Sequence, residues 1–257
     1  MIPCLKTSCN CAVYGILAAM NIILFETVPT DGFIPANDFR GEHIMRILKL
    51  AVGDSFQLGE IDGRQGLATI TTVSPQGVWF SWNPQTSRPN MYPVTLLVAQ
   101  VRPICMKRIL REAVSLGVEQ ILVTGADTAE HSYQDAKLWS TGEYRKYLLD
   151  GAMQSACTGM SRIQFLKRVD DVVDGTWDFP GKLLLDNMLP GERLADFTYR
   201  GGRLVLAIGP ERGWSDRERD VLVEGGFQPY TLGGRVLRTE TACSAGVAVL
   251  LARMGLL

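Results

Sequence analysis

The chain has 257 residues, of which 46% are hydrophobic and 21% are charged, and its formal net charge is −1. This length allows one large or two modest domains with a sizeable core. The near-zero charge excludes a globally basic nucleic-acid binder, so any such contact must come from local patches. Six cysteines without a compact repeating spacing do not form a disulfide framework, which favours a reducing cytoplasm.

The first 19 residues, MIPCLKTSCNCAVYGILAA, contain three cysteines, and no charge lies between Lys6 and Glu26. One interpretation is a signal peptide, with Lys6 as its positive region and residues 12–19 as a short apolar core. The polar residues within the run favour the alternative, an upstream start codon or a disordered tail. No histidine lies near these cysteines to complete a metal site, and the segment is too short and polar for a membrane span. We therefore expect residues 1–19 to be a disordered extension.

Residues 20–89 have the pattern of a small, mostly β domain. Ile44, Ile47 and Leu48 have the spacing of an amphipathic helix, which predicts a helix over Glu42–Leu50. Asp-Gly and Ser-Pro-Gln-Gly turn signals separate the later strands. The expected strands are Asn21–Glu26, Ser55–Ile61, Gly66–Val73 and Gly77–Trp82.

A proline-containing linker over Asn83–Tyr92 precedes a second domain, at about 91–257, in which strands and helices alternate. A helix is expected to begin at Pro103 and to end at Gly117, and a long helix is expected over about Thr141–Thr158. Such alternation favours a parallel sheet and an α/β fold class. The expected strands are Val94–Val101, Gln120–Thr124, Ile163–Leu166, Leu183–Asp186 and Leu204–Ile208.

The segment from 204 to 242 contains two strands that each end in a glycine-containing loop and lead into a helix. Ser215–Glu218 reads S-D-R-E, a capping box, and the glycine pair at 225–226 is expected to end that helix. Tyr230–Leu232 is the second strand, and a helix follows from Thr239. Ligands of open α/β sheets bind at loops of this kind.

These two loops also contain specific sequence motifs, IGPERGWS and LGGRVLRTETA. The pair resembles the I-G-P-E-G-G-F-S and L-G-x-R-I-L-R-x-E-T-A motifs of the bacterial 16S ribosomal RNA uridine-N3 methyltransferases, of the SPOUT class. The resemblance implies an N-terminal PUA-like β-barrel domain followed by a SPOUT-type α/β domain with a C-terminal trefoil knot. The alternating pattern by itself indicates α/β and nothing about a knot.

The resemblance implies S-adenosylmethionine as the cofactor, bound by three loops. Glycines in such loops let backbone amides and carbonyls approach a ligand closely. Neither a G-x-G-x-x-G helix start nor a P-loop motif is present, which excludes those two nucleotide sites. The residues implied to bind the cofactor are Leu185, Ile208, Gly209, Pro210, Glu211, Gly213, Leu232, Gly233, Val236, Leu237 and Thr239.

Methylation of uridine N3 requires loss of the imide proton and attack on a sulfonium methyl group. A cationic donor aimed at the carbonyl oxygens would stabilise the resulting anion, and Arg238 is the first candidate for this role. Glu240 could act as general base or could orient Arg238. Glu211 could instead tie down its loop. The alternative for Arg238 and Glu240 is a structural salt bridge.

The implied partners are ribosomal RNA or the small ribosomal subunit, with a homodimer through the knotted domain. The small residues of the last helix, Thr241–Met254, permit close helix contact. With only two histidines in the chain, no metal site is expected, and no membrane span either. A solvated helix face is the alternative for the first four of the residues implied to bind RNA. The full set is Arg40, His43, Arg46, Lys49, Lys107, Arg108, His131 and Arg235.

The sequence departs from the family pattern at four positions. Arg212 stands where the family has glycine, His131 and Cys157 replace arginines, and Glu112 stands where lysine is usual. The cofactor side is mostly kept and the substrate side is altered. Two alternatives therefore stay open beside uridine methylation of 16S RNA: a degenerate RNA-binding protein, and the same chemistry on another RNA.

Overall fold

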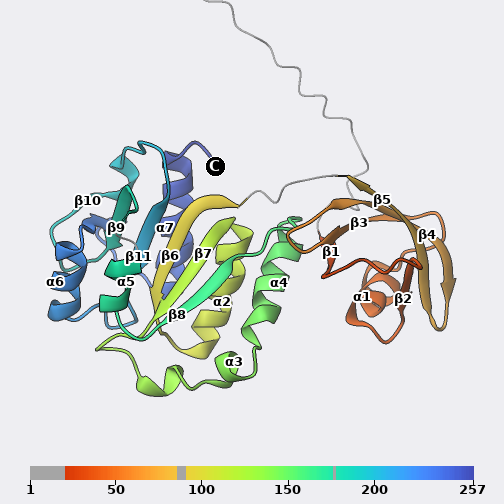
Figure 1. Cartoon of the computed structure of the whole chain (residues 1–257), viewed down its shortest axis with the longest axis horizontal. Helices are drawn as coiled ribbons and strands as arrows, with labels where there is room; N and C mark the ends of the chain where they lie inside the picture. Colours follow the sequence, from red (N-terminus) through yellow and green to blue (C-terminus); the bar gives the residue numbers. More distant parts are fainter. Residues whose placement is uncertain (1–20, 86–90, 176–177) are drawn as a thin grey trace, which may run out of the picture.

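The computed structural model describes residues 21–85, 91–175 and 178–257 (Figure 1). The predicted extension at 1–19 and residues 86–90 of the predicted linker lie outside these ranges. Two units are visible, a smaller curled sheet and a larger sheet with helices on both faces.

The smaller unit is a five-stranded, barrel-like sheet with the order β1-β3-β4-β5-β2. β1 pairs with β3 in parallel, and the other pairs are antiparallel. Its interior is filled by residues such as Ile34, Ile44 and Leu58, all fully buried. The strands are β1 (Ile22–Phe25), β2 (Phe33–Pro35), β3 (Ser55–Glu60), β4 (Gln65–Ser74) and β5 (Gly77–Gln85).

The helix expected over Glu42–Leu50 is different in the structure. A short α-helix, α1 (Phe39–Glu42), continues as a π-helix, η1 (His43–Leu48), in which the Lys49 amide donates to the Ile44 carbonyl. Ile44 is buried, whereas Ile47 is 68% exposed. The predicted apolar face was wrong because the i, i+3, i+4 spacing shares one face at α-helical winding, not at i→i+5 winding.

The larger unit is a seven-stranded sheet in the order β10-β12-β9-β11-β6-β7-β8, and every pair in it is parallel. The predicted parallel sheet is thus confirmed. The two central strands are apolar on both faces, since helices cover each side. The strands are β6 (Tyr92–Ala99), β7 (Val118–Thr124), β8 (Arg162–Leu166), β9 (Gly181–Leu185), β10 (Glu192–Arg193), β11 (Leu204–Ile208) and β12 (Gln228–Thr231).

The helices α2 and α7 pack side by side, with α4 against α2, and α5 contacts α6 on the other side of the sheet (Figure 1). The long helix expected over Thr141–Thr158 is shorter, because Gly142 (φ +73°) separates α3 from α4 and Ala156 (φ +53°) follows its end. The helices are α2 (Pro103–Ser115), α3 (Lys137–Ser140), α4 (Tyr144–Gln154), α5 (Asp170–Gly175), α6 (Asp216–Glu224) and α7 (Thr239–Arg253), with single 3-10 turns η2 (His131–Tyr133) and η3 (Leu194–Asp196).

The C-terminal part of the sheet is not in chain order. β12 lies between β9 and β10, so the segment between β9 and β11 encloses the later chain, which continues into α7 against η3. This is the topology of a SPOUT-type domain with a C-terminal trefoil knot, an exception to the usual avoidance of threaded chains.

Strand β1 joins the two units. Ile22 and Leu24 pack into the core of the larger unit, whereas Ile23 and Phe25 face the core of the smaller one. The Thr158 hydroxyl also donates to the Gly63 carbonyl across this boundary. Within the described ranges, no helix is long and apolar enough to cross a membrane.

Candidate functional site

A cavity of about 240 Å³ opens at the carboxyl ends of β9, β11 and β12. Its walls are three chain segments, 185–188, 208–214 and 230–237, with the first turn of α7. Carboxyl ends of parallel strands meet at one edge of a sheet, which is why loops distant in sequence come together here. All of the residues predicted to bind the cofactor line this cavity. They are Leu185, Ile208, Gly209, Pro210, Glu211, Gly213, Leu232, Gly233, Val236, Leu237 and Thr239.

The loop after β11 has its shape because of two glycines. The Gly213 amide donates to the Pro210 carbonyl at 2.8 Å, and Gly213 has φ +73°, which favours glycine. A Cβ on Gly209 would lie 3.0 Å from the Trp214 amide nitrogen, so this position also has no room for a side chain. The loop backbone therefore approaches the cavity closely.

A buried ion pair that the motifs did not indicate fixes the loop after β9. The Arg219 Nε donates to Asp186 Oδ2 at 3.0 Å, and the two side chains are 10% and 2% exposed. Asp186 also accepts the Met188 amide at 2.7 Å. Both charged residues line the cavity. Their only sequence signal is an acidic residue directly after a buried strand.

Trp214 forms a further wall that sequence reasoning missed. Its side chain is 2% exposed, and its Nε1–H has no hydrogen-bond partner among the described residues. Tyr230 and Ala242 are further lining residues that were not predicted. Together with Leu185 and Ile208, these residues form the apolar part of the lining, and polar groups such as Asp186 and Arg219 line a comparable share of it.

The two predicted catalytic residues lie at the start of α7 and differ in burial and in contacts. Arg238 is the exposed N-cap residue, between two cavity-lining neighbours, and its guanidinium has no partner in the described part of the chain. The Glu240 carboxylate is nearly buried, 3.9 Å from Arg108 Nη1 of α2. Neither Arg238 nor Glu240 belongs to the cavity lining, and no contact between the two side chains is present in the described chain.

Helices α2 and α7 meet through polar and thiol groups beside the cavity. The Ser244 hydroxyl donates to Glu112, the residue that stands at a family lysine position. Burial, together with nearby carboxylates including Glu240, raises the pKa values of the Cys105 and Cys243 thiols. Both thiols are therefore protonated at neutral pH. Glu112 acts here as a contact between the helices.

The residues of the smaller unit that were predicted to bind RNA differ in how many contacts they make within the protein. Arg40 donates to the Leu24 carbonyl at 2.7 Å and pairs with Asp38 at 3.0 Å, so it supports the fold. Arg46 forms an exposed pair with Glu42. His43 has a buried Nε2 atom without a partner among the described atoms. Lys49 has no ion pair in the described chain and a left-handed backbone.

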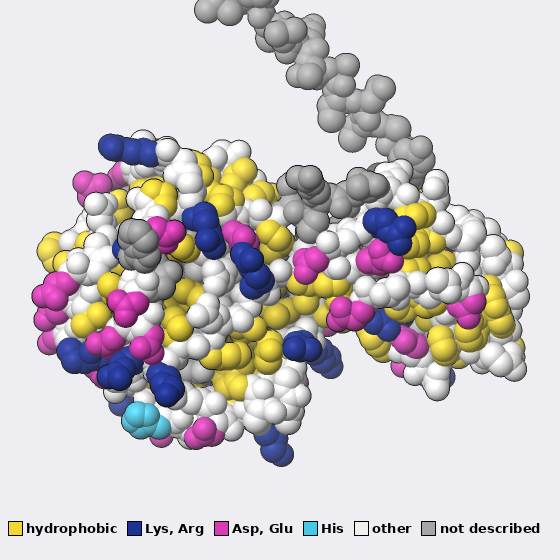
Figure 2. All heavy atoms as spheres, viewed as in Figure 1, with side chains coloured by type: hydrophobic (Ala, Val, Ile, Leu, Met, Phe, Trp, Pro, Cys, Tyr) yellow, Lys and Arg dark blue, Asp and Glu magenta, His cyan; other side chains and the backbone are white. Residues whose placement is uncertain are grey.

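In the larger unit, Lys107 pairs with Glu143 at 2.8 Å, and this hydrogen bond raises the pKa of the Lys107 ammonium group. Arg108 is half exposed beside α7. His131 and Arg235 are exposed, and Arg235 lines the cavity together with Arg212. Figure 2 shows basic side chains interspersed with acidic ones at the lower left of this unit. No metal-binding group of side chains is present in the described ranges.

Comparison with known proteins matches residues 88–251 to a family model described as an RNA methyltransferase domain. A Treponema pallidum protein named ribosomal RNA small subunit methyltransferase E is 34% identical over 242 residues, 91% of each chain. The chain belongs to this family. A Borreliella burgdorferi member is 29% identical over 88% of this chain and 95% of its own length.

Solved structures of other family members have the same fold. Ribosomal RNA small subunit methyltransferase E of Neisseria gonorrhoeae, bound to S-adenosyl methionine, superposes with a TM-score of 0.74 at 22% identity, over 91% of this chain and 97% of its own. A putative methyltransferase of Legionella pneumophila, also in complex with that cofactor, gives 0.75 at 22% identity with the same coverage.

Proposed function

We propose that the protein transfers a methyl group from S-adenosylmethionine to N3 of a uridine in 16S ribosomal RNA. The observation that carries this proposal is the cavity at the knotted end of the sheet, where both motif loops meet. The family membership supports the substrate class, since its members are named ribosomal RNA small subunit methyltransferases. In this proposal, residues 91–257 form the methyltransferase domain and residues 20–89 an RNA-binding domain.

The cavity fits S-adenosylmethionine in its chemistry. Apolar walls from Leu185, Ile208 and Leu237 suit an adenine ring, and glycine-containing loops offer backbone groups for its polar edge. The unpartnered Trp214 Nε1–H and the buried Asp186 carboxylate are further polar groups in the wall. When bound, the cofactor supplies an electrophilic methyl group on its sulfonium.

Arg238 is the residue we propose to stabilise the reacting uridine. Arg238 is the N-cap residue of a fifteen-residue helix, between the cavity-lining residues Leu237 and Thr239, and no carboxylate in the described chain neutralises its guanidinium. Loss of the N3 proton places negative charge on the neighbouring carbonyl oxygens, which a preorganised cation stabilises. Glu240 remains a proposal as general base, and its contact with Arg108 favours a positioning role instead.

We also propose that the enzyme is a homodimer through the knotted domain. Ile104 at the start of α2 is 61% exposed and Val236 beside the cavity is 81% exposed. A second copy packed against these side chains would remove their apolar surface from water. The candidates for phosphate contacts include Lys49, Arg212 and Arg235, basic residues that have no ion pair within the described ranges.

The test is a calorimetric titration of the purified protein with S-adenosylmethionine, followed by methyl transfer to 16S ribosomal RNA and mapping of the modified nucleotide. Saturable binding with methylated uridine N3 supports the proposal. Cofactor binding together with methylation of a different nucleotide would assign the enzyme a different RNA target. If only Arg212→Gly bound the cofactor, the guanidinium at the cavity rim would block it, and the RNA-binding protein would be the better description.

Arg238→Ala is expected to lose transfer by about a hundredfold or more while keeping its fold, because one preorganised donor to an anion contributes about that much. The measurement is single-turnover transfer, with circular dichroism and cofactor titration as controls. Unchanged turnover would remove Arg238 from the mechanism.

A further inference from the structure

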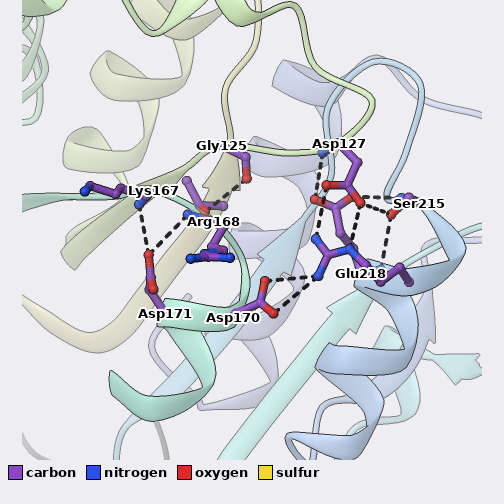
Figure 3. Close-up of polar contacts among 10 residues, drawn as sticks. Gly125, Asp127, Lys167, Arg168, Asp170, Asp171, Ser215 and Glu218 are labelled. Carbon is purple, nitrogen blue, oxygen red and sulfur yellow. Dashed lines mark hydrogen bonds and ion pairs between the residues drawn. The ribbon is translucent and has the colours of Figure 1, made fainter.

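Hydrogen bonds join the loop after β7 to the start of α6 (Figure 3). A further bond joins it to residues 209–213 after β11, which we call the cofactor loop. We call the loop after β7 the 125–133 segment; it contains the exposed His131. The bonds connect residues 85 to 91 positions apart in sequence. The segment is therefore held by tertiary contacts to the elements that form the cavity.

Glu218 is the buried centre of this network. Glu218 is only 1% exposed. Its carboxylate accepts hydrogen bonds from two backbone amides, that of Asp127 at 2.9 Å and that of Ser215 at 2.8 Å. The second bond completes the capping box of α6, and the first connects the 125–133 segment to it. A buried carboxylate needs such donors, so both bonds are expected to persist.

Asp127 makes the charged part of the network. It accepts the Ser215 hydroxyl at 2.6 Å and the Arg217 Nε at 3.0 Å. Arg217 also pairs with Asp170 at the start of α5 at 3.1 Å. These bonds end on residues beyond the cavity, since Ser215, Arg217 and Glu218 are outside its lining.

Thr128 differs from the rest because its bond ends on the cavity wall. Its hydroxyl donates to the Gly213 carbonyl at 2.5 Å, and Gly213 is the left-handed residue of the cofactor loop. Near the other end of the segment, Tyr133 bonds the Arg102 guanidinium, and the Arg102 amide donates to Glu211 of the same loop at 3.1 Å. The segment thus contacts the 209–213 loop directly through Thr128 and is connected to it indirectly through Arg102.

We propose that Thr128 is a positioning residue that couples the 125–133 segment to the cofactor loop, so that S-adenosylmethionine binding orders the segment that presents His131 to RNA. A ligand that fixes one conformation of Gly213 also fixes the group that donates to its carbonyl. The coupling is reciprocal, so RNA held by the segment favours the cofactor-bound loop. This inference rests on the proposed function.

Hydrogen exchange with and without S-adenosylmethionine, read by peptide mass spectrometry, tests the coupling. In the parent protein, the cofactor is expected to slow exchange in both 209–214 and 125–133. Thr128→Val removes the donor at nearly constant volume, so slowing is expected in 209–214 alone. Thr128→Ser keeps the hydroxyl and is expected to restore the parent pattern, which controls for misfolding. Asp170→Asn removes a bond of the same network that ends outside the cavity, and it is expected to behave as the parent.

A kinetic measurement separates coupling from stability. Thr128→Val is expected to raise the KM for 16S ribosomal RNA about tenfold with kcat at saturating RNA unchanged, the loss expected for one hydrogen bond. If the parent binds no cofactor, the proposed function fails and the inference with it. If the parent binds S-adenosylmethionine, but the amides of residues 125–133 exchange at the same rate with and without it, only the inference is overturned. A loss of the response in Asp170→Asn equal to that in Thr128→Val would also overturn it.

Discussion

At the scale of single residues, the wall of the cavity depends on the Asp186–Arg219 ion pair. Both side chains are nearly buried, and the carboxylate also accepts backbone amides of the loop after β9. Removing one member of such a pair leaves a buried charge with little compensation. Arg219 would retain only Asp216, which is 98% exposed.

Asp186→Ala is therefore expected to lower the free energy of unfolding by about 3 kcal/mol and to weaken cofactor binding. Urea unfolding and cofactor titration measure the two effects. Asp196→Ala is the matched control, because its pair with Arg193 is exposed and should contribute much less to stability. Equal losses in the two variants would contradict this role for burial.

Asp127 gives a pH prediction at the same scale. Hydrogen bonds from Arg217 and Ser215 hold the pKa of its carboxyl below the ordinary value of about 3.9. A depressed pKa in the folded state contributes stability that is present above the unfolded pKa and is lost as pH falls through the folded pKa. The stability difference between the parent and Asp127→Asn should be constant from about pH 5 to 8 and vanish in more acid solution. A difference that changes near neutral pH in denaturant titrations would contradict it.

At the scale of elements, the packing of α7 determines how close the residues at its N-terminus lie to the sheet. Gly246 faces the strands, and a Cβ there would lie 2.7 Å from Leu185 Cδ1 and 3.1 Å from Leu206 Cδ2. The helix can therefore lie directly against β9 and β11. Its N-terminus carries Thr239 at the cavity as a result, directly after the N-cap residue Arg238.

Gly246→Leu is expected to destabilise the fold by about 1–3 kcal/mol and to lower cofactor affinity, because α7 must move away from Leu185. Thr241→Leu, an exposed position on the same helix, should change stability by less than about 0.5 kcal/mol. Thermal unfolding and cofactor titration of both variants are the measurements. Parent-like behaviour of Gly246→Leu would show that the contact is not tight.

At the scale of the whole molecule, β1 makes the two units one folding unit. Alternate residues of this four-residue strand pack into different cores. Leu24 is 0% exposed and Ile23 is 1% exposed. Unfolding of one core therefore removes β1 packing contacts from the other core. The smaller unit therefore has a fixed orientation relative to the cavity.

Leu24→Ala and Ile23→Ala are each expected to cost about 2–5 kcal/mol and to shift the same single unfolding transition. Scanning calorimetry of both variants tests this. Two transitions, with each substitution moving a different one, would show that the units unfold independently.

Much of the site could be predicted from local sequence. The capping box at Ser215–Glu218, the strand Leu204–Ile208 and the left-handed Gly213 all depend on neighbours within a few residues, so their signals survive without tertiary information. The two motif loops were enough to identify the family and to gather the cofactor-site candidates. The parallel sheet followed from the alternation of strands and helices.

The remaining features depend on partners distant in sequence, and only the tertiary structure decided them. Asp186 meets Arg219 across 33 residues, and the Asp127 amide meets Glu218 across 91. Glu240 faces α2 because helix packing places Arg108 beside it. The π-helical winding after His43 likewise overrode the spacing of its apolar residues. Periodicity and motifs report local geometry, whereas charge pairing and side-chain direction depend on which elements the knotted chain brings together.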